Sequence, residues 1–111
     1  MAHSSPFRLV FTTCPDAASA EALAKRLVED RLAACVNIVA GVWSVYHWEG
    51  KLETGAEQLL IVKTKETQYP ELEARILEKH PYELPEVVSV QIDKGLPAYL
   101  GWIDSSLSEE S

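Results

Sequence analysis

Two long β-rich stretches joined by a tight turn constrain the fold of this chain more than any other feature. Residues 34–48 are rich in β-branched and aromatic side chains, Glu49 and Gly50 predict a tight turn, and residues 51–65 form a second β-rich stretch. Arms of about 14 residues, at about 3.3 Å per residue, extend about 45 Å. A compact domain of 111 residues has a radius of gyration of only about 13 Å. The tip of this hairpin is therefore expected to overhang the core.

The expected overhang is rich in large apolar side chains. They are Trp43, Val45, Tyr46 and Trp48. Monomeric proteins rarely leave so much apolar area in water, and free strand edges tend to pair with other strands. We therefore expect a second copy of the chain to cover the hairpin. The alternative is that bulges, predicted at Gly41 and Gly55, fold the hairpin back over its own sheet.

The flanking segments predict two helices packed on one face of a sheet. In chain order, the expected elements are a strand over 7–13, a helix capped by Asp16, the two hairpin arms, a helix from 67 or 68 to 79, a strand over 86–93 and a closing helix from 96 to 107. The apolar face of the second helix comprises Tyr69, Leu72, Ile76 and Leu77. This order predicts an α+β fold, a ferredoxin-like βαββαβ sandwich with an extended central hairpin and a C-terminal helix. We expect one domain over 7–107 between flexible tails at 1–6 and 108–111.

Charge and apolar patterning narrow the classes of function. The net charge is −7 and the ten basic residues form no cluster, which disfavours binding to nucleic acid or anionic lipid. No apolar run approaches the roughly 18 residues of a membrane span. The N-terminal residues lack the pattern of a signal peptide, so a cytoplasmic protein is expected, with Cys14 and Cys35 as free thiols.

The segment 79–87 concentrates the chemistry of the chain. It carries His80, Tyr82, Glu83 and Glu86, and Pro81 and Pro85 restrict its backbone. Such a loop can present a binding site before a ligand arrives. His80 with nearby carboxylates could hold a divalent ion weakly, and residues from another subunit could complete the site. The alternatives are that His80 bonds the last helix carbonyls, that Tyr82 packs over Pro85, and that both glutamates are simply solvated.

Four motifs of this chain together resemble the CutA family of divalent-cation tolerance proteins. They are RLAACVN at 31–37, SVYHWEGK at 44–51, Lys63-Thr64 and HPYELPE at 80–86. The resemblance covers about residues 7–107. It implies a compact homotrimer in which the long hairpins pair between chains, similar in architecture to PII signalling proteins. It also implies tolerance to copper and other divalent ions, without an established enzymatic reaction.

The resemblance carries over to single residues only in part. Copper sites of the family are placed at a cysteine of the first strand and at histidines before the Pro-Tyr-Glu motif. Those positions hold Thr12, Lys79 and His80 in this chain, so His80 is the expected metal ligand.

The resulting hypothesis is a non-enzymatic homotrimer that binds a divalent cation such as copper, or a small ligand, in clefts between subunits. The residues expected to line these clefts are Tyr46, Trp48, Lys63, His80, Tyr82, Glu83 and Glu86. The main alternative is a PII-like signalling or protein-interaction module in which metal binding is incidental. A hydrolase is a third reading that rests on fold analogy alone.

Overall fold

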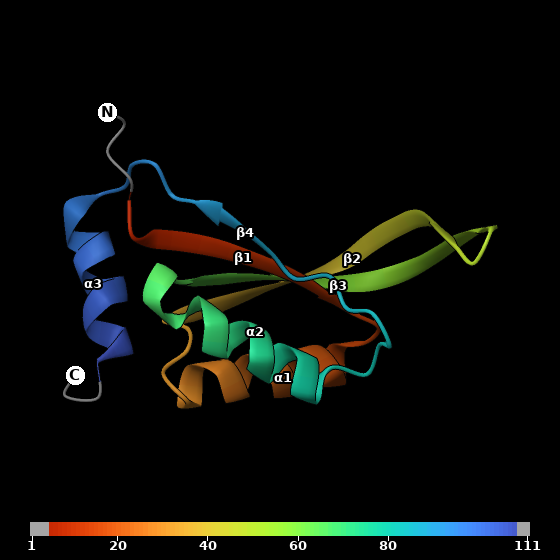
Figure 1. The fold of residues 1–111 in the computed structure, drawn as a ribbon, viewed down its shortest axis with the longest axis horizontal. Coiled ribbons are helices and arrows are strands. Elements are labelled where there is room, and N and C mark those ends of the chain that lie inside the picture. Colours follow the sequence, from red (N-terminus) through yellow and green to blue (C-terminus); the bar gives the residue numbers. More distant parts are fainter. Residues whose placement is uncertain (1–4, 109–111) are drawn as a thin grey trace.

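The computed structural model describes residues 5–108 and has the expected order of elements (Figure 1). These are β1 (Phe7–Cys14), α1 (Ala17–Glu29), β2 (Cys35–Trp48), β3 (Lys51–Lys65), the short 3-10 helix η1 (Glu66–Gln68), α2 (Tyr69–Lys79), β4 (Val88–Gln91) and α3 (Pro97–Leu107). The predicted ferredoxin-like α+β fold is confirmed. The predicted tails fall mostly outside the described residues, so their boundaries stay predictions.

The four strands form one antiparallel sheet in the order β2-β3-β1-β4. Helices α1 and α2 lie side by side on one face of this sheet, and α3 lies at its end, away from the hairpin tip (Figure 1). Ala34 packs with Ile103 and Leu107 of α3, and Lys65 of β3 is 2.6 Å from Asp104. These contacts attach α3 to the sheet. Among residues 5–108, none of the helices combines the length and the hydrophobicity that a membrane span requires.

The core lies between the sheet and its two covering helices. Alternate residues of the central strands face the helices, because successive strand side chains point to opposite sides of a sheet. Its fully buried members include Val10, Thr12, Cys14, Ala20, Leu27, Leu60, Val62, Thr64, Leu72 and Ile76. Leu77, predicted on the apolar face of α2, is exposed. Fewer side chains of α2 are buried than its apolar residues predicted, namely those of Leu72 and Ile76.

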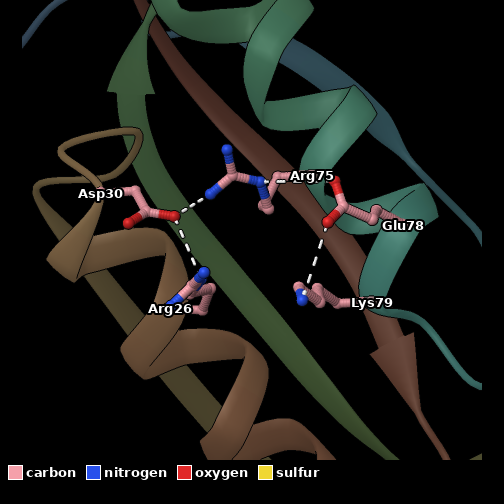
Figure 2. Close-up of polar contacts among 5 residues, drawn as sticks. All are labelled: Arg26, Asp30, Arg75, Glu78 and Lys79. Carbon is pink, nitrogen blue, oxygen red and sulfur yellow. Dashed lines mark hydrogen bonds and ion pairs between the residues drawn. The ribbon is translucent and has the colours of Figure 1, made fainter.

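Polar contacts cap α1 and tie it to α2. Asp16 accepts a 2.7 Å hydrogen bond from the backbone N–H of Ser19, as expected of a helix cap. At the other end of α1, Asp30 pairs with Arg75 of α2 and with Arg26, whose Nε is 3.3 Å away (Figure 2). A single carboxylate thus bridges two helices that lie 45 residues apart in sequence at this contact.

The hairpin overhangs the rest of the molecule, as predicted. Strand β1 pairs with β3 only between Lys65 and Gln58, so beyond that point β2 and β3 pair with each other alone. They extend past the helices (Figure 1), and the molecule measures 44 × 34 × 23 Å. Trp43 is 65% exposed. The alternative in which the hairpin folds back over its own sheet is wrong.

Two details of the sheet differ from the prediction. Gly41 lies in a β-bulge at φ 79°, but Gly55 pairs in register with Ser44 and makes no bulge. Strand β4 covers only Val88–Gln91 instead of 86–93. Its ladder with β1 starts at Val88, because Pro85 has no N–H to donate and the residues around it remain in the loop.

Candidate functional site

A cleft of about 870 Å³ lies where the hairpin leaves the covered part of the sheet. One wall is the hairpin and the end of β1, and the other is the loop between α2 and β4. Its lining residues are Thr13, Ser44, Val45, Tyr46, Trp48, Glu57 and the continuous segment 82–88. Leu60 of β3 faces the helices, and Glu57, three residues earlier, points to the opposite face, because successive side chains of a strand alternate between the two faces. The cleft therefore opens on the face of the sheet away from α1 and α2.

The bulge at Gly41 decides which aromatic side chains reach the cleft. Val39 pairs with Leu59 but Val42 pairs with Glu57, so β2 carries one extra residue there. Paired residues share a face, and the extra residue moves the even-numbered residues of β2 onto the face of Glu57. Tyr46 and Trp48 therefore line the cleft, whereas Trp43 does not.

Glu57 joins the two walls of the cleft. Its Oε2 accepts a 2.7 Å hydrogen bond from the Tyr82 hydroxyl, across 25 residues of sequence. Sequence reasoning missed Glu57. Glu57 lies in the polar stretch 53–58 of the predicted strand, where nothing local distinguishes it from Glu53, and only the register shows that it faces the loop.

Electrostatics keep Glu57 ionised and Tyr82 protonated. Burial on its own raises the pKa of Glu57. Hydrogen bonds from the side chains of Ser44, Tyr82 and Thr13 outweigh burial and leave that pKa below its ordinary value. Burial, followed by the bond to Glu57, raises the pKa of Tyr82. Tyr82 is thus a firm hydrogen-bond donor to a carboxylate.

His80 stands behind Tyr82 and does not line the cleft. Its Nδ1 accepts a 3.1 Å hydrogen bond from the backbone N–H of Tyr82, so Nε2 carries the proton and donates to the Thr13 carbonyl at 2.7 Å. The imidazole also lies 4.8 Å, centroid to centroid, from the Tyr82 ring. The imidazole of His80 bonds a carbonyl of β1 and orients Tyr82, while the backbone N–H of His80 bonds the Ile76 carbonyl in the last turn of α2.

The residues around His80 do not form a ready-made copper site. The closest soft ligand is Cys14, whose Sγ is 3.8 Å from Nε2 of His80. Burial is the main cause that raises the pKa of Cys14, whereas the metal-binding form is the thiolate. Both ring nitrogens of His80 are already bonded to the protein. Within residues 5–108, no group of three or more His, Cys, Asp or Glu side chains is placed to hold a metal ion.

The structure brings most of the predicted site residues together. Five of the seven line the cleft: Tyr46, Trp48, Tyr82, Glu83 and Glu86. His80 supports one wall. Lys63 lies elsewhere, with its Nζ 5.6 Å from the centroid of the Tyr99 ring on α3. Within one chain Lys63 does not reach the other six.

Comparisons with known proteins identify the family of this chain. Residues 8–106 match the family described as CutA1 divalent ion tolerance protein. The divalent-cation tolerance protein CutA of Thermus thermophilus is 45% identical over 86% of this chain and 92% of its own length. The rice protein CutA 1, chloroplastic, is 42% identical over 94% of this chain, which spans 59% of the rice protein.

Solved structures show the same fold. The crystal structure of CutA from Xylella fastidiosa has a TM-score of 0.91 and 44% identity, covering 94% of this chain and all of that one. CutA1 from Oryza sativa also has a TM-score of 0.91, with 42% identity over 96% of this chain and 97% of that one. A family match over nearly the whole length, relatives above 40% identity and a shared fold lead to one conclusion: the chain belongs to the CutA family.

Proposed function

We propose that this chain acts in divalent-cation tolerance as a cytoplasmic homotrimer, and that it binds a ligand in clefts shared between subunits without catalysing a reaction. The tolerance role is supported by family membership and by the names of relatives such as the Thermus thermophilus protein. The observation that carries the binding role is the cleft itself, whose two walls are joined by the hydrogen bond between Glu57 and Tyr82.

The exposed hairpin supports the trimer. Trp43, Val45 and Leu52 are each more than half exposed, and a neighbouring hairpin paired along the free edge of β2 would cover them. Sedimentation equilibrium at low micromolar concentration should give three times the chain mass of 12.3 kDa. Trp43→Asp should dissociate the trimer, whereas Leu77→Asp, a similar change on exposed α2, should not. A folded species of one-chain mass for the unmodified protein would contradict the trimer.

A divalent cation such as copper is the first ligand to test, with His80 as the proposed metal ligand. Because both nitrogens of His80 are bonded to the protein, the imidazole would have to release one of them, and a second chain would have to supply further ligands. Calorimetric titration with Cu(II), Zn(II) and Ni(II) tests this. The heat should fall in His80→Ala and persist in His47→Ala, a histidine at the exposed tip. Equal heats in both variants would show that His80 is not a metal ligand.

A PII-like interaction module is the second candidate. The loop between α2 and β4 is stiffened by two prolines and exposes Leu84, which suits contact with a protein partner. A partner retained in the presence of a chelator and lost in Leu84→Ser would favour this role. Loss of the partner on chelation would favour the cation role.

A further inference from the structure

The chemical character of the cleft indicates what kind of ligand it takes. Its lining combines three aromatic rings, those of Tyr46, Trp48 and Tyr82, with three carboxylates, those of Glu57, Glu83 and Glu86. No Lys, Arg or His side chain is part of the lining within residues 5–108. An anionic ligand such as a nucleotide would find carboxylates and no compensating positive charge on this chain's side of the cleft, so this lining disfavours it.

The aromatic rings offer accessible faces. Tyr46 is 49% exposed and Trp48 is 37% exposed, while Tyr82 is held in place by Glu57 and by the ring of His80. The face of an aromatic ring carries negative electrostatic potential and attracts cations, most strongly for Trp. A bare metal ion makes little use of such faces, whereas an organic cation uses both the charge and the apolar contact.

The carboxylates lie close enough to influence one another. Burial, and then the negative charge of Glu57, raise the pKa of Glu86. Two carboxylates that repel each other across a cleft are stabilised by a cation placed between them. The charge of the cleft and its aromatic faces therefore favour the same sign of ligand.

The size and apolar lining of the cleft fit a small organic molecule. Its volume of about 870 Å³ lies within the range of roughly 300–1,000 Å³ that is typical of ligand pockets. Leu84 and Val88, which are 70% and 49% exposed, add apolar contact surface that matches alkyl groups. Resting on the proposed function of this cleft, we propose that its ligand is a small organic cation, an alkylammonium group held between the aromatic rings and the carboxylates.

Three probes of the same shape isolate the charge. They are 3-methylbutylamine, which is protonated at neutral pH, the neutral alcohol 3-methylbutan-1-ol and the anion 3-methylbutanoate. Titrations of the intact protein, followed by Trp fluorescence and calorimetry, should show the ammonium binding at least ~10-fold more tightly than the alcohol, because cation–π contacts and carboxylates act on the charge alone. The carboxylate should bind most weakly.

Variants with matched controls locate the site. Trp48→Leu and Glu57→Gln should each weaken ammonium binding about 10-fold. Trp102→Leu and Glu21→Gln should leave it unchanged, because Trp102, 45% exposed, lies on α3 and Glu21 pairs with Lys25 on α1. Circular dichroism and sedimentation of each variant would show that fold and assembly are retained.

The outcomes separate this inference from the proposed function. Equal binding of amine and alcohol, or undiminished amine binding in Glu57→Gln, would overturn the inference that the ligand is an organic cation. The proposal that the cleft binds a ligand would stand. If no probe binds while divalent ions still give heat, the inference fails and the cation role stands. If neither the probes nor the ions bind, both fail.

Discussion

The two halves of the β2–β3 hairpin contain the same two strands but are stabilised differently. In the inner half, Leu60 is fully buried under α1 and α2, while in the outer half Leu52 on the same strand is 66% exposed. The inner half obtains its apolar burial within one chain. In the single chain, no helix or strand covers the outer half of the hairpin. The cleft therefore lies at the boundary between the part of the hairpin that is buried within one chain and the part that is left exposed.

The largest expected effect contrasts two leucines on β3. Leu60→Ala should lower the free energy of unfolding by about 2–5 kcal/mol, because it opens a cavity among fully buried side chains. Leu52→Ala should lower it by less than about 1 kcal/mol where the hairpin is unpaired, because the side chain is then largely in water, and by more where a neighbouring hairpin covers Leu52. Urea unfolding of both variants measures the difference. Equal losses would mean that the outer half is as enclosed as the inner one.

The next contrast concerns the two glycines inside the hairpin. Gly41→Val should lower the free energy of unfolding by about 1–3 kcal/mol, because φ is 79° and a β-branched residue is strained there. Gly55→Val serves as the control, since Gly55 has no positive φ and its Cβ would meet open space. It should be neutral within about 0.5 kcal/mol. If the two changes were equivalent in urea unfolding, the bulge would not define the boundary.

A smaller effect is expected at the bridge between the covering helices. Arg75→Met should cost about 1 kcal/mol, since Asp30 is only 29% exposed and would keep Arg26 alone (Figure 2). Lys25→Met breaks an ion pair whose two side chains are both more than 60% exposed, so it should leave stability essentially unchanged. Thermal unfolding compares the two variants. A larger loss for Lys25→Met would contradict the role of Asp30.

The smallest effect is a pH dependence at the cleft. The pKa of Glu57 is lower in the folded protein than its ordinary value of 4.5, so its ionised form contributes stability above that value. This contribution is lost as the pH falls through the folded pKa. Stability measured by urea unfolding from pH 6 to pH 3 should therefore decline less steeply in Glu57→Gln than in the unmodified protein.

Glu86 supplies the opposite control for that experiment. Its pKa is raised, so its neutral form contributes stability below 4.5, and this contribution disappears as the pH rises through the folded value. Glu86→Gln should therefore steepen the decline on acidification. The same direction of change in both variants would contradict the electrostatics of the cleft.

Local sequence signals predicted the elements well and the site in part. The Asp16 cap, the helix end at His80-Pro81 and the turn at Glu49-Gly50 depend on residues close together in sequence, and all three are confirmed. The β4 bounds, the exposure of Leu77 and the regular pairing of Gly55 were predicted wrongly. The exposure of Leu77 and the pairing of Gly55 depend on which distant helix or strand lies opposite, and local pattern does not contain that information. The start of β4 was predicted too early, because the residues around Pro85 remain in the loop.

The residues of the cleft likewise divide into those that the sequence predicted and those that only the structure identified. Tyr46, Trp48, Tyr82, Glu83 and Glu86 were identified from the residue types and the stiff loop, and the structure places them on one cleft. Glu57 was missed, because its role arises from the register of β3 against a loop 25 residues away. Lys63 was grouped with the others, yet it lies beneath α3.

The sequence by itself determined the order of the elements, the length of the hairpin and the stiffness of the 80–86 loop, because these follow from backbone preferences and side-chain periodicity over a few residues. Only the tertiary structure decided which face of the hairpin meets the loop. It also decided that Glu57 accepts a hydrogen bond from Tyr82 and that both ring nitrogens of His80 are hydrogen-bonded within the protein. One extra residue at Gly41 reverses the faces of all that follows on β2, and such a shift is defined only against the partner strand.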